Sequence, residues 1–223
     1  KKFSFIELCL RDRYLFLLIS LLSLILIIPL FEDIVALTTL HDIFITGTFL
    51  ASLYAISQKI QRLPLAAGLL LPVVAGIWLT YFVHIPYLRL VGDCCSILFF
   101  AFTIILILSS LLREYEITLD GIYGAVAVYL LMALMWAFMF DVIETLRPGS
   151  YQVTANPLHG TRVHFIYYSF VTITTVGYGD ILPVSLTARA FSIVEMITGQ
   201  VYLVVLIARL VGINITQSMD KKS

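Results

Sequence analysis

The sequence of 223 residues predicts an all-α membrane protein with six transmembrane helices. Composition is the first observation behind this fold class, because 61% of the residues are hydrophobic, only 13% are charged, and the mean hydropathy of +1.01 is far above that of soluble domains. The second observation is the pattern of apolar segments. Six of them, each about as long as a helix that crosses a bilayer, alternate with polar or proline-containing breaks.

The predicted spanning helices follow one another along the chain. They lie at Tyr14 to Leu30, Ile43 to Gln58, Leu65 to Val83, Cys94 to Leu112, Ile122 to Phe140 and Ala188 to Val211. The first four form a predicted four-helix domain, residues 1–113, and the last two belong to a second domain, residues 114–223. Between helices five and six, the segment from Phe165 to Thr175 is too short to cross and is predicted to be a re-entrant helix enclosed by protein.

Lysines and arginines predict the orientation of these helices. With the N-terminus in the cytoplasm, ten basic residues are cytoplasmic and four are outside, in agreement with the positive-inside rule. The ten are Lys1, Lys2, Arg11, Arg13, Lys59, Arg62, Arg113, Arg209, Lys221 and Lys222, and the four are Arg89, Arg147, Arg162 and Arg189. Both termini are then cytoplasmic, and the protein is expected in a plasma or inner membrane.

The connection from Asp141 to Thr161 lies outside in this orientation. Its segments Pro148-Gly149-Ser150 and Asn156-Pro157 predict turns and no further element. The 14 basic and 14 acidic residues balance, which gives no reason to expect a nucleic acid as a partner. Membrane lipids are the expected surroundings.

The stretch from Thr174 to Asp180, Thr-Thr-Val-Gly-Tyr-Gly-Asp, is the most informative in the chain. Successive carbonyl groups point to one side only where some residues accept unusual dihedrals, and Gly177 and Gly179 accept them without a Cβ penalty. Such a row of oxygens can replace the hydration shell of a cation. Thr175 adds a hydroxyl at the inner end, while Asp180 is expected at the outer mouth.

Aromatic residues of the short helix are predicted to support this stretch. Tyr178 is expected to pack against Tyr167 and Tyr168, and Asp180 to accept a hydrogen bond from a neighbour such as Tyr168. The short helix ends at Thr174, where the negative end of its dipole favours a dehydrated cation. The predicted site is therefore a cation site made mainly of backbone.

Residues 119 to 214 resemble the tetrameric potassium channel family in their outer helix, short helix from Phe165 to Ile173, motif at 174 to 180 and inner helix with Gly199. The resemblance implies a homotetramer that conducts K⁺ passively and selectively. It implies K⁺ binding at Thr175, Val176, Gly177 and Tyr178, with Gly179 completing the filter, and a gating hinge at Gly199. The permeant ion is the ligand that it implies, with no organic cofactor.

The first four helices resemble the sensor domain of six-helix, voltage-gated channels in architecture alone. In voltage-gated members the fourth helix carries an arginine at every third position, whereas Cys94 to Leu112 contains no basic residue. Each elementary charge that crosses the field is worth about 2.3 kcal/mol per 100 mV, so a helix without charges gives almost no voltage coupling. The sequence predicts a channel without a voltage sensor of this type.

Glu195 lies in the sixth helix, and an ionisable group at membrane depth is costly unless it is paired. In one interpretation its carboxyl lies behind the filter, bonded to a hydroxyl such as that of Thr172 or to nearby backbone, and makes gating sensitive to protons. In the other it faces a solvated crevice between subunits. Leu203, Ile207 and Val211 recur at helical spacing and either line a cavity or gate or pack in a core.

Two other classes of function are left open. A non-conducting regulatory or assembly subunit of a cation channel would use the first four helices for interaction, although nothing in the motif looks disabled. A subunit of an ion transporter would normally carry four degenerate pore loops, and this chain has one, with both glycines. Paired carboxylates in a pocket, a nucleophile elbow and a phosphate loop are all absent from the sequence, so no enzyme activity is expected.

Overall fold

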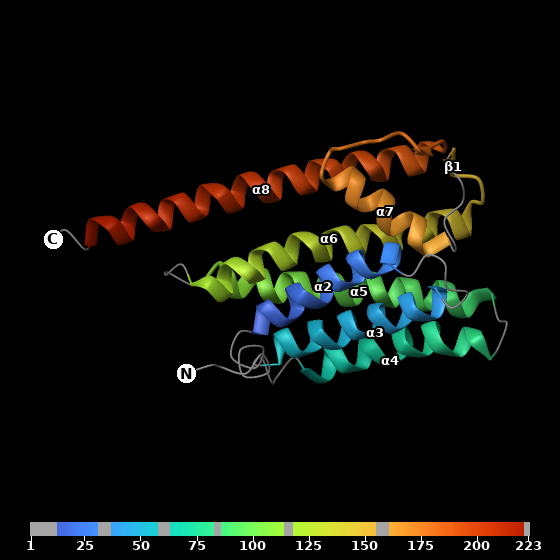
Figure 1. The fold of residues 1–223 in the computed structure, drawn as a ribbon, viewed down its shortest axis with the longest axis horizontal. Coiled ribbons are helices and arrows are strands. Elements are labelled where there is room, and N and C mark those ends of the chain that lie inside the picture. Colours follow the sequence, from blue (N-terminus) through green and yellow to red (C-terminus); the bar gives the residue numbers. More distant parts are fainter. Residues whose placement is uncertain are drawn as a thin grey trace.

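A computed structural model describes residues 13–30, 37–57, 63–82, 86–113, 118–154 and 161–220. Its elements, in order, are α2 (Arg13–Leu30), α3 (Leu37–Ile56), α4 (Leu63–Trp78), the 3₁₀ turn η2 (Leu79–Tyr81), α5 (Pro86–Leu111), α6 (Leu119–Leu146), β1 (Tyr151–Val153), α7 (Thr161–Ile173), β2 (Ile181–Pro183) and α8 (Leu186–Asp220). Long helices run alongside one another, and α8, with 35 residues, extends beyond the rest (Figure 1).

The predicted fold class, an all-α membrane protein, is confirmed at the level of its helices. Five helical segments among the described residues are long and apolar enough to cross a membrane: Thr39–Ile56, Pro64–Tyr81, Tyr87–Leu111, Leu119–Leu146 and Leu186–Arg209. The apolar segment Arg13–Leu26 of α2 is shorter. The strands β1 and β2 have three residues each and form a small antiparallel sheet. The prediction of turns and no further element between Asp141 and Thr161 is therefore wrong, because β1 lies there and pairs with β2.

The helices begin earlier than predicted, and in α3, α5 and α7 the added residues include charged side chains that are paired: α3 starts at Leu37 instead of Ile43 and so includes Asp42. The fourth predicted helix starts at Cys94, whereas α5 starts at Pro86 and so includes Arg89 and Asp93. The short helix, predicted from Phe165, starts at Thr161 and ends at Ile173. A prediction from hydropathy ends a helix where charged residues appear. Ion pairs within the fold lower the cost of burying those residues, so the helix continues through them.

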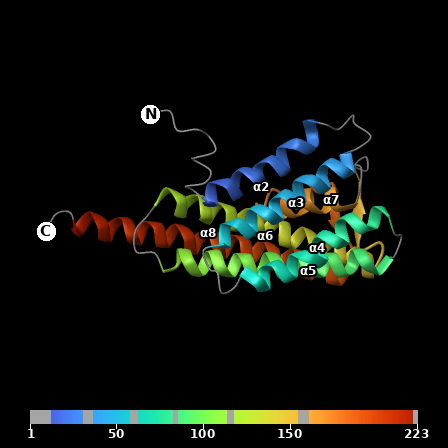
Figure 2. The same cartoon turned by 90° about the horizontal axis from the view of Figure 1, so that it is seen from below.

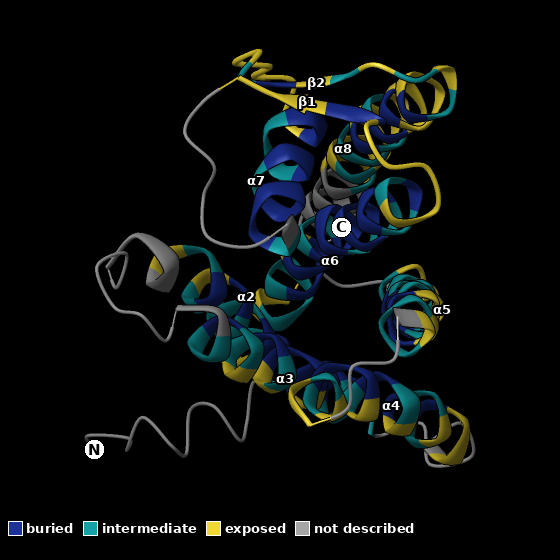
Figure 3. Cartoon of the chain, turned by 90° about the vertical axis from the view of Figure 1, so that its right-hand side faces the viewer, coloured by how far each residue is buried: buried dark blue, intermediate teal, exposed yellow. Residues whose placement is uncertain are grey.

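The helices form two groups that share α6. Seen end-on, the N-terminal helices α2 to α5 lie on one side of α6, and α7, α8 and the two strands lie on the other (Figure 3). The view from below shows α2 and α3 side by side, next to α6 (Figure 2). A core of phenylalanines joins the N-terminal helices to α6: the Phe49 ring of α3 stacks on Phe100 of α5 at 4.5 Å between centroids and lies 6.2 Å from Phe138 of α6.

The two long helices of the C-terminal group differ in how far this chain covers them. In α6, 67% of the residues of the apolar span are buried, against 17% in the span of α8. Its central position explains the burial of α6. The outer face of α8 stays uncovered, as its exposed colouring in Figure 3 shows.

Candidate functional site

The segment that follows α7, residues 174–180, has an unusual alternating backbone and is called the filter segment below. The φ angle is positive at every second residue: 60° at Thr175, 58° at Gly177 and 81° at Gly179. Both glycines therefore adopt the conformation that their lack of a side chain allows. Thr175 is the one non-glycine residue with positive φ in the part of the chain that the structure describes. Such strain typically concentrates at functional sites.

Backbone hydrogen bonds orient the N-terminal half of the filter segment. Three of its amides donate to carbonyls of α7: Thr175 N to Thr172 O at 2.9 Å, and Val176 N and Gly177 N to Val171 O at 3.0 and 3.3 Å. In a trans peptide the C=O points opposite to the following N–H. The carbonyls of the preceding residues, 174 to 176, therefore point away from α7, on a face that this chain leaves exposed.

Asp180 fixes the C-terminal end of the filter segment. Its Oδ2 accepts a hydrogen bond of 2.7 Å from the hydroxyl of Tyr167, and its backbone carbonyl accepts from the amide and the hydroxyl of Thr154, both at 2.8 Å. Thr154 follows β1, and β1 pairs with β2 directly after Asp180. The filter segment is thus attached at one end to α7 and at the other to this two-stranded sheet.

The expected bond from Tyr168 to Asp180 is wrong. Tyr168 is buried and its hydroxyl bonds to Ser192 Oγ of α8 at 2.7 Å, while Tyr167 bonds to Asp180. Successive residues of a helix point about 100° apart, so the two tyrosines face different sides of α7. Tyr178 is 72% exposed and has no ring contact with either tyrosine of the same chain among the described residues.

The hydrogen bond of Tyr167 persists at neutral pH because its phenol keeps the proton. Partial burial and the bond to the Asp180 carboxylate raise the pKa of Tyr167 to about 12. At neutral pH the phenol is therefore a donor, and the Asp180 side chain is its acceptor.

Glu195 lies fully buried behind α7. Its Oε1 contacts Ser169 Oγ, and Ser169 Oγ also bonds to the carbonyl of Ala133 in α6 at 2.6 Å. The structure thus brings Glu195 to a hydroxyl of the short helix, though to that of Ser169 and not of Thr172. Glu195 Oε2 has no hydrogen-bond partner among the described residues.

Gly199 allows α8 to approach the end of α7 closely. A Cβ at this position would lie 2.5 Å from Ile173 Cγ1 and 3.1 Å from the Ile173 carbonyl oxygen. That carbonyl also accepts a hydrogen bond of 3.0 Å from the Tyr129 hydroxyl of α6. The helix α8 continues through Gly199, so in this structure the glycine serves close packing.

The gate candidates lie further along α8. Leu203 is half-buried, and Ile207 and Val211 are 59% and 54% exposed in this chain. Among the described residues, no group of His, Cys, Asp or Glu is arranged to hold a metal ion.

Sequence reasoning missed the residues that support the filter segment from a distance. Ser169, Thr154 and Tyr129 each bond across elements, and no local pattern marks them. Arg162 is different, because a single cation in an otherwise apolar short helix is a visible signal that a partner exists.

Comparison with known proteins supports the identity of this region. A family model described as "Ion channel" matches residues 125–215. The chain is 47% identical over 67 residues to a protein named two-pore potassium channel 4 of Arabidopsis thaliana, 34% over 65 residues to two pore potassium channel c of Oryza sativa subsp. japonica, and 48% over 44 residues to voltage-gated potassium channel Kch of Escherichia coli.

These matches cover only part of each protein. The match to the Arabidopsis protein spans 28% of this chain and 24% of that relative. The match to the Oryza protein spans 29% and 14%, and the match to Kch spans 20% and 11%, of this chain and of the relative respectively. No solved structure matches. The family match includes α7 and the filter segment and overlaps α6 and α8, so this region is similar to ion channels, and the relatives that it resembles are named as potassium channels.

Proposed function

We propose that this chain is the pore-forming subunit of a K⁺-selective channel that conducts passively. The observation that carries the proposal is the backbone of the filter segment, where positive φ angles alternate and three amides bond back to α7. Carbonyl groups that face one side at this spacing suit a dehydrated K⁺. The ion-binding residues are Thr175, Val176, Gly177, Tyr178 and Gly179, and Thr174, Asp180, Tyr167, Tyr168 and Glu195 support them.

The functional unit that we propose is a homotetramer in the membrane lipid. Each chain supplies one filter segment, and one row of carbonyls cannot surround an ion. Two observations support association: the filter segment is exposed, and only 17% of the apolar span of α8 is buried within the chain. Neighbouring copies around a central axis would cover both surfaces.

The N-terminal helices form, in this proposal, a sensor-like domain of residues 1–113 in front of a pore domain of residues 114–223. Six helices cross the membrane, with α2 as the first, and both termini are cytoplasmic. The predicted turn at Asn156-Pro157 lies outside the described residues. So do seven of the basic residues from which the orientation is predicted: Lys1, Lys2, Arg11, Lys59, Arg62, Lys221 and Lys222.

Gating in the proposed channel does not use a voltage sensor of the S4 type. The helix α5 contains one basic residue, Arg89 in its first turn, and the Nη2 of Arg89 lies 2.7 Å from Asp141 Oδ2 of α6. Bilayer recordings should show weak voltage dependence. Steep voltage activation that is abolished by substitutions between residues 94 and 113 would contradict this part of the proposal.

Glu195 is proposed to tune the filter from behind as a neutral carboxyl. A serine hydroxyl has one hydrogen, so Ser169 cannot donate to both Ala133 O and Glu195 at once. A protonated Glu195 solves this, because it donates to Ser169 Oγ while Ser169 donates to Ala133 O. Protons would then affect conduction through this group.

The purified chain in liposomes tests the proposed function. With K⁺ inside and Na⁺ outside, the expected reversal potential follows the K⁺ gradient and shifts when external K⁺ replaces Na⁺. An ion flux that does not discriminate K⁺ from Na⁺ contradicts a selective filter. If no flux occurs alone but a co-reconstituted channel changes its conductance, the chain is instead a regulatory subunit.

A further inference from the structure

Arg162 occupies an unfavourable place in the sequence of α7. It is the second residue of the helix and the only Lys, Arg, Asp or Glu in its 13 residues. The positive end of the helix dipole lies there and disfavours a cation. Its side chain is nevertheless only 15% exposed. Contacts with other elements must therefore hold this arginine in place.

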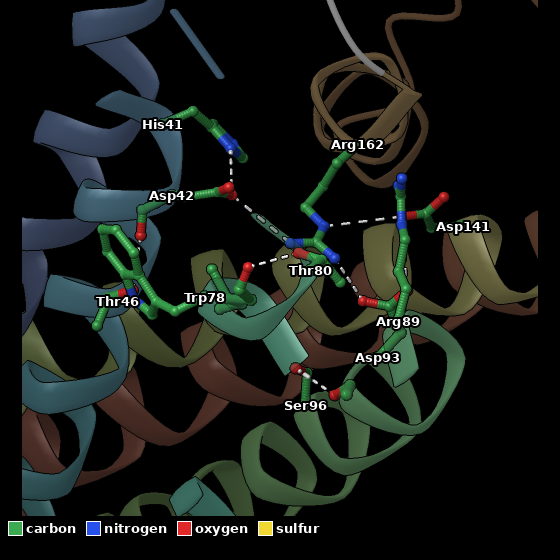
Figure 4. Close-up of polar contacts among 12 residues, drawn as sticks. His41, Asp42, Thr46, Trp78, Thr80, Arg89, Asp93, Ser96, Asp141 and Arg162 are labelled. Carbon is green, nitrogen blue, oxygen red and sulfur yellow. Dashed lines mark hydrogen bonds and ion pairs between the residues drawn. The ribbon is translucent and has the colours of Figure 1, made fainter. Parts of the chain in front are cut away.

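Three carboxylates from three helices surround the guanidinium of Arg162 (Figure 4). Its Nη2 lies 2.7 Å from Asp93 Oδ1 of α5, its Nε 3.7 Å from Asp141 Oδ2 of α6, and its Nη1 3.7 Å from Asp42 Oδ1 of α3. The Phe138 ring lies beneath it, 5.1 Å from Cζ. Two of these carboxylates come from the N-terminal helices, so one side chain joins that group to α7.

The charges of this cluster depend on one another. Asp93 and Asp141 are almost fully buried, and Arg89 is the second cation, bonded to Asp141 at 2.7 Å. Asp42 has a further donor, the Tyr81 hydroxyl at 2.8 Å. Three carboxylates share two guanidinium groups. Without Arg162, Asp93 would lose its shortest ion pair while staying buried, which is strongly unfavourable.

The opposite end of α7 holds the filter segment. The carbonyls of Val171 and Thr172 accept its amides, and Ser169 bonds α7 to α6 midway. A helix of 13 residues is a rigid rod of roughly 20 Å. A displacement of its first turn therefore moves the carbonyls that orient the filter segment.

We propose that Arg162 is a positioning residue through which α3 and α5 set the place of α7 and, with it, the geometry of the filter. This inference rests on the proposed function. In this proposal the N-terminal helices need no gating arginines to affect the filter. They supply the carboxylates of Asp42 and Asp93, which fix the N-terminal end of α7.

The test compares Arg162→Gln, Asp93→Asn and the double variant with wild type in liposomes, by K⁺ over Na⁺ permeability ratio. We expect Arg162→Gln to lower the ratio at least about tenfold and Asp93→Asn to lower it less. The double variant should be no worse than Arg162→Gln alone, because both changes break one pair. Arg162→Lys should recover part of the ratio. Arg147→Gln is the control, an exposed arginine whose bond is to Thr187.

An unchanged ratio in folded Arg162→Gln overturns the proposal, as does a double variant whose loss is the sum of the single losses. If Arg162→Gln does not fold, the other two variants, Asp93→Asn and Arg162→Lys, test the proposal. A lowered K⁺ over Na⁺ permeability ratio in both supports the coupling, and a wild-type ratio in both overturns it. Failure of the proposed function is seen separately, because wild type itself would then show no K⁺ selectivity.

Discussion

The two ends of α7 are held by different kinds of contact. At the C-terminal end, carbonyls of α7 accept amides of the filter segment that follows it. At the N-terminal end, the side chain of Arg162 contacts carboxylates as far as 120 residues away in sequence, such as Asp42. The first kind depends on backbone geometry and the second on charge. Filter geometry is therefore a local property, while the placement of the filter in the fold depends on distant side chains.

Gly177→Ala tests the local end and should have the largest effect. Alanine at positive φ costs about 1–2 kcal/mol per chain, which is about 4–8 kcal/mol over the four chains of a tetramer, so K⁺ flux should fall at least about 100-fold. Gly149→Ala is the matched control, because its φ of 85° is equally left-handed and no atom lies within 4 Å of the added Cβ. An equal loss of flux in both variants would show that backbone strain anywhere disables conduction.

Gly199→Ala tests the contact between α8 and the C-terminal end of α7. The new Cβ would crowd Ile173, and overpacking costs about 1–3 kcal/mol, so we expect a lower melting temperature and about tenfold less flux. Gly212→Ala is the control in the same helix, because no side chain or distant backbone atom lies within 4 Å of the added Cβ. A normal melting temperature with slowed opening in Gly199→Ala would instead favour a hinge.

Glu195→Gln tests the middle of α7, where a side chain meets the helix from behind. The amide can donate to Ser169 Oγ as the neutral carboxyl does, so folding and conduction should remain, within about threefold of wild type. Wild-type conduction should fall as the pH rises, because an ionised carboxyl loses its donor, whereas the variant should not respond. The idea fails if the open probability and its pH dependence are the same in both proteins.

Tyr167→Phe should have the smallest effect, since it removes one hydrogen bond to a partly exposed site. Loss of the bond to Asp180 should speed the decay of K⁺ current about two- to threefold. The pKa of about 12 means that wild type keeps this bond until the pH approaches that value, so the difference should be constant from neutral to mildly alkaline pH. Tyr87→Phe, an exposed tyrosine of α5, is the control.

Local sequence was sufficient to predict the parts of the site that depend on backbone. Gly177 and Gly179 have the positive φ that their residue type allows, and α7 precedes them as a short helix. The positive φ of Thr175 was not predictable from its residue type, because amide bonds to α7 impose it. A hydroxyl of the short helix was correctly predicted as the partner of Glu195, but the residue that supplies it is Ser169 and not Thr172.

Contacts between distant elements were not predictable from one sequence. Asp93 and Arg162 lie 69 residues apart and each interrupts an apolar segment, so hydropathy alone places helix ends near them. Pairing in three dimensions removes that penalty and lengthens α5 and α7. The partner of Asp180 was not predictable either, because packing on α6 and α8 fixes the rotation of α7 about its axis. That rotation directs Tyr167, and not Tyr168, toward Asp180.

The uncovered filter segment has a consequence for how the protein is made. Carbonyls of residues 174 to 176 point away from their own chain, and backbone oxygens facing lipid have no donor to satisfy them. A solitary chain in a bilayer therefore has no low-energy environment for its most important atoms. In the proposed tetramer, the filter takes its final form only as the subunits meet, and the K⁺ it then binds stabilises the assembled state over the separate chains.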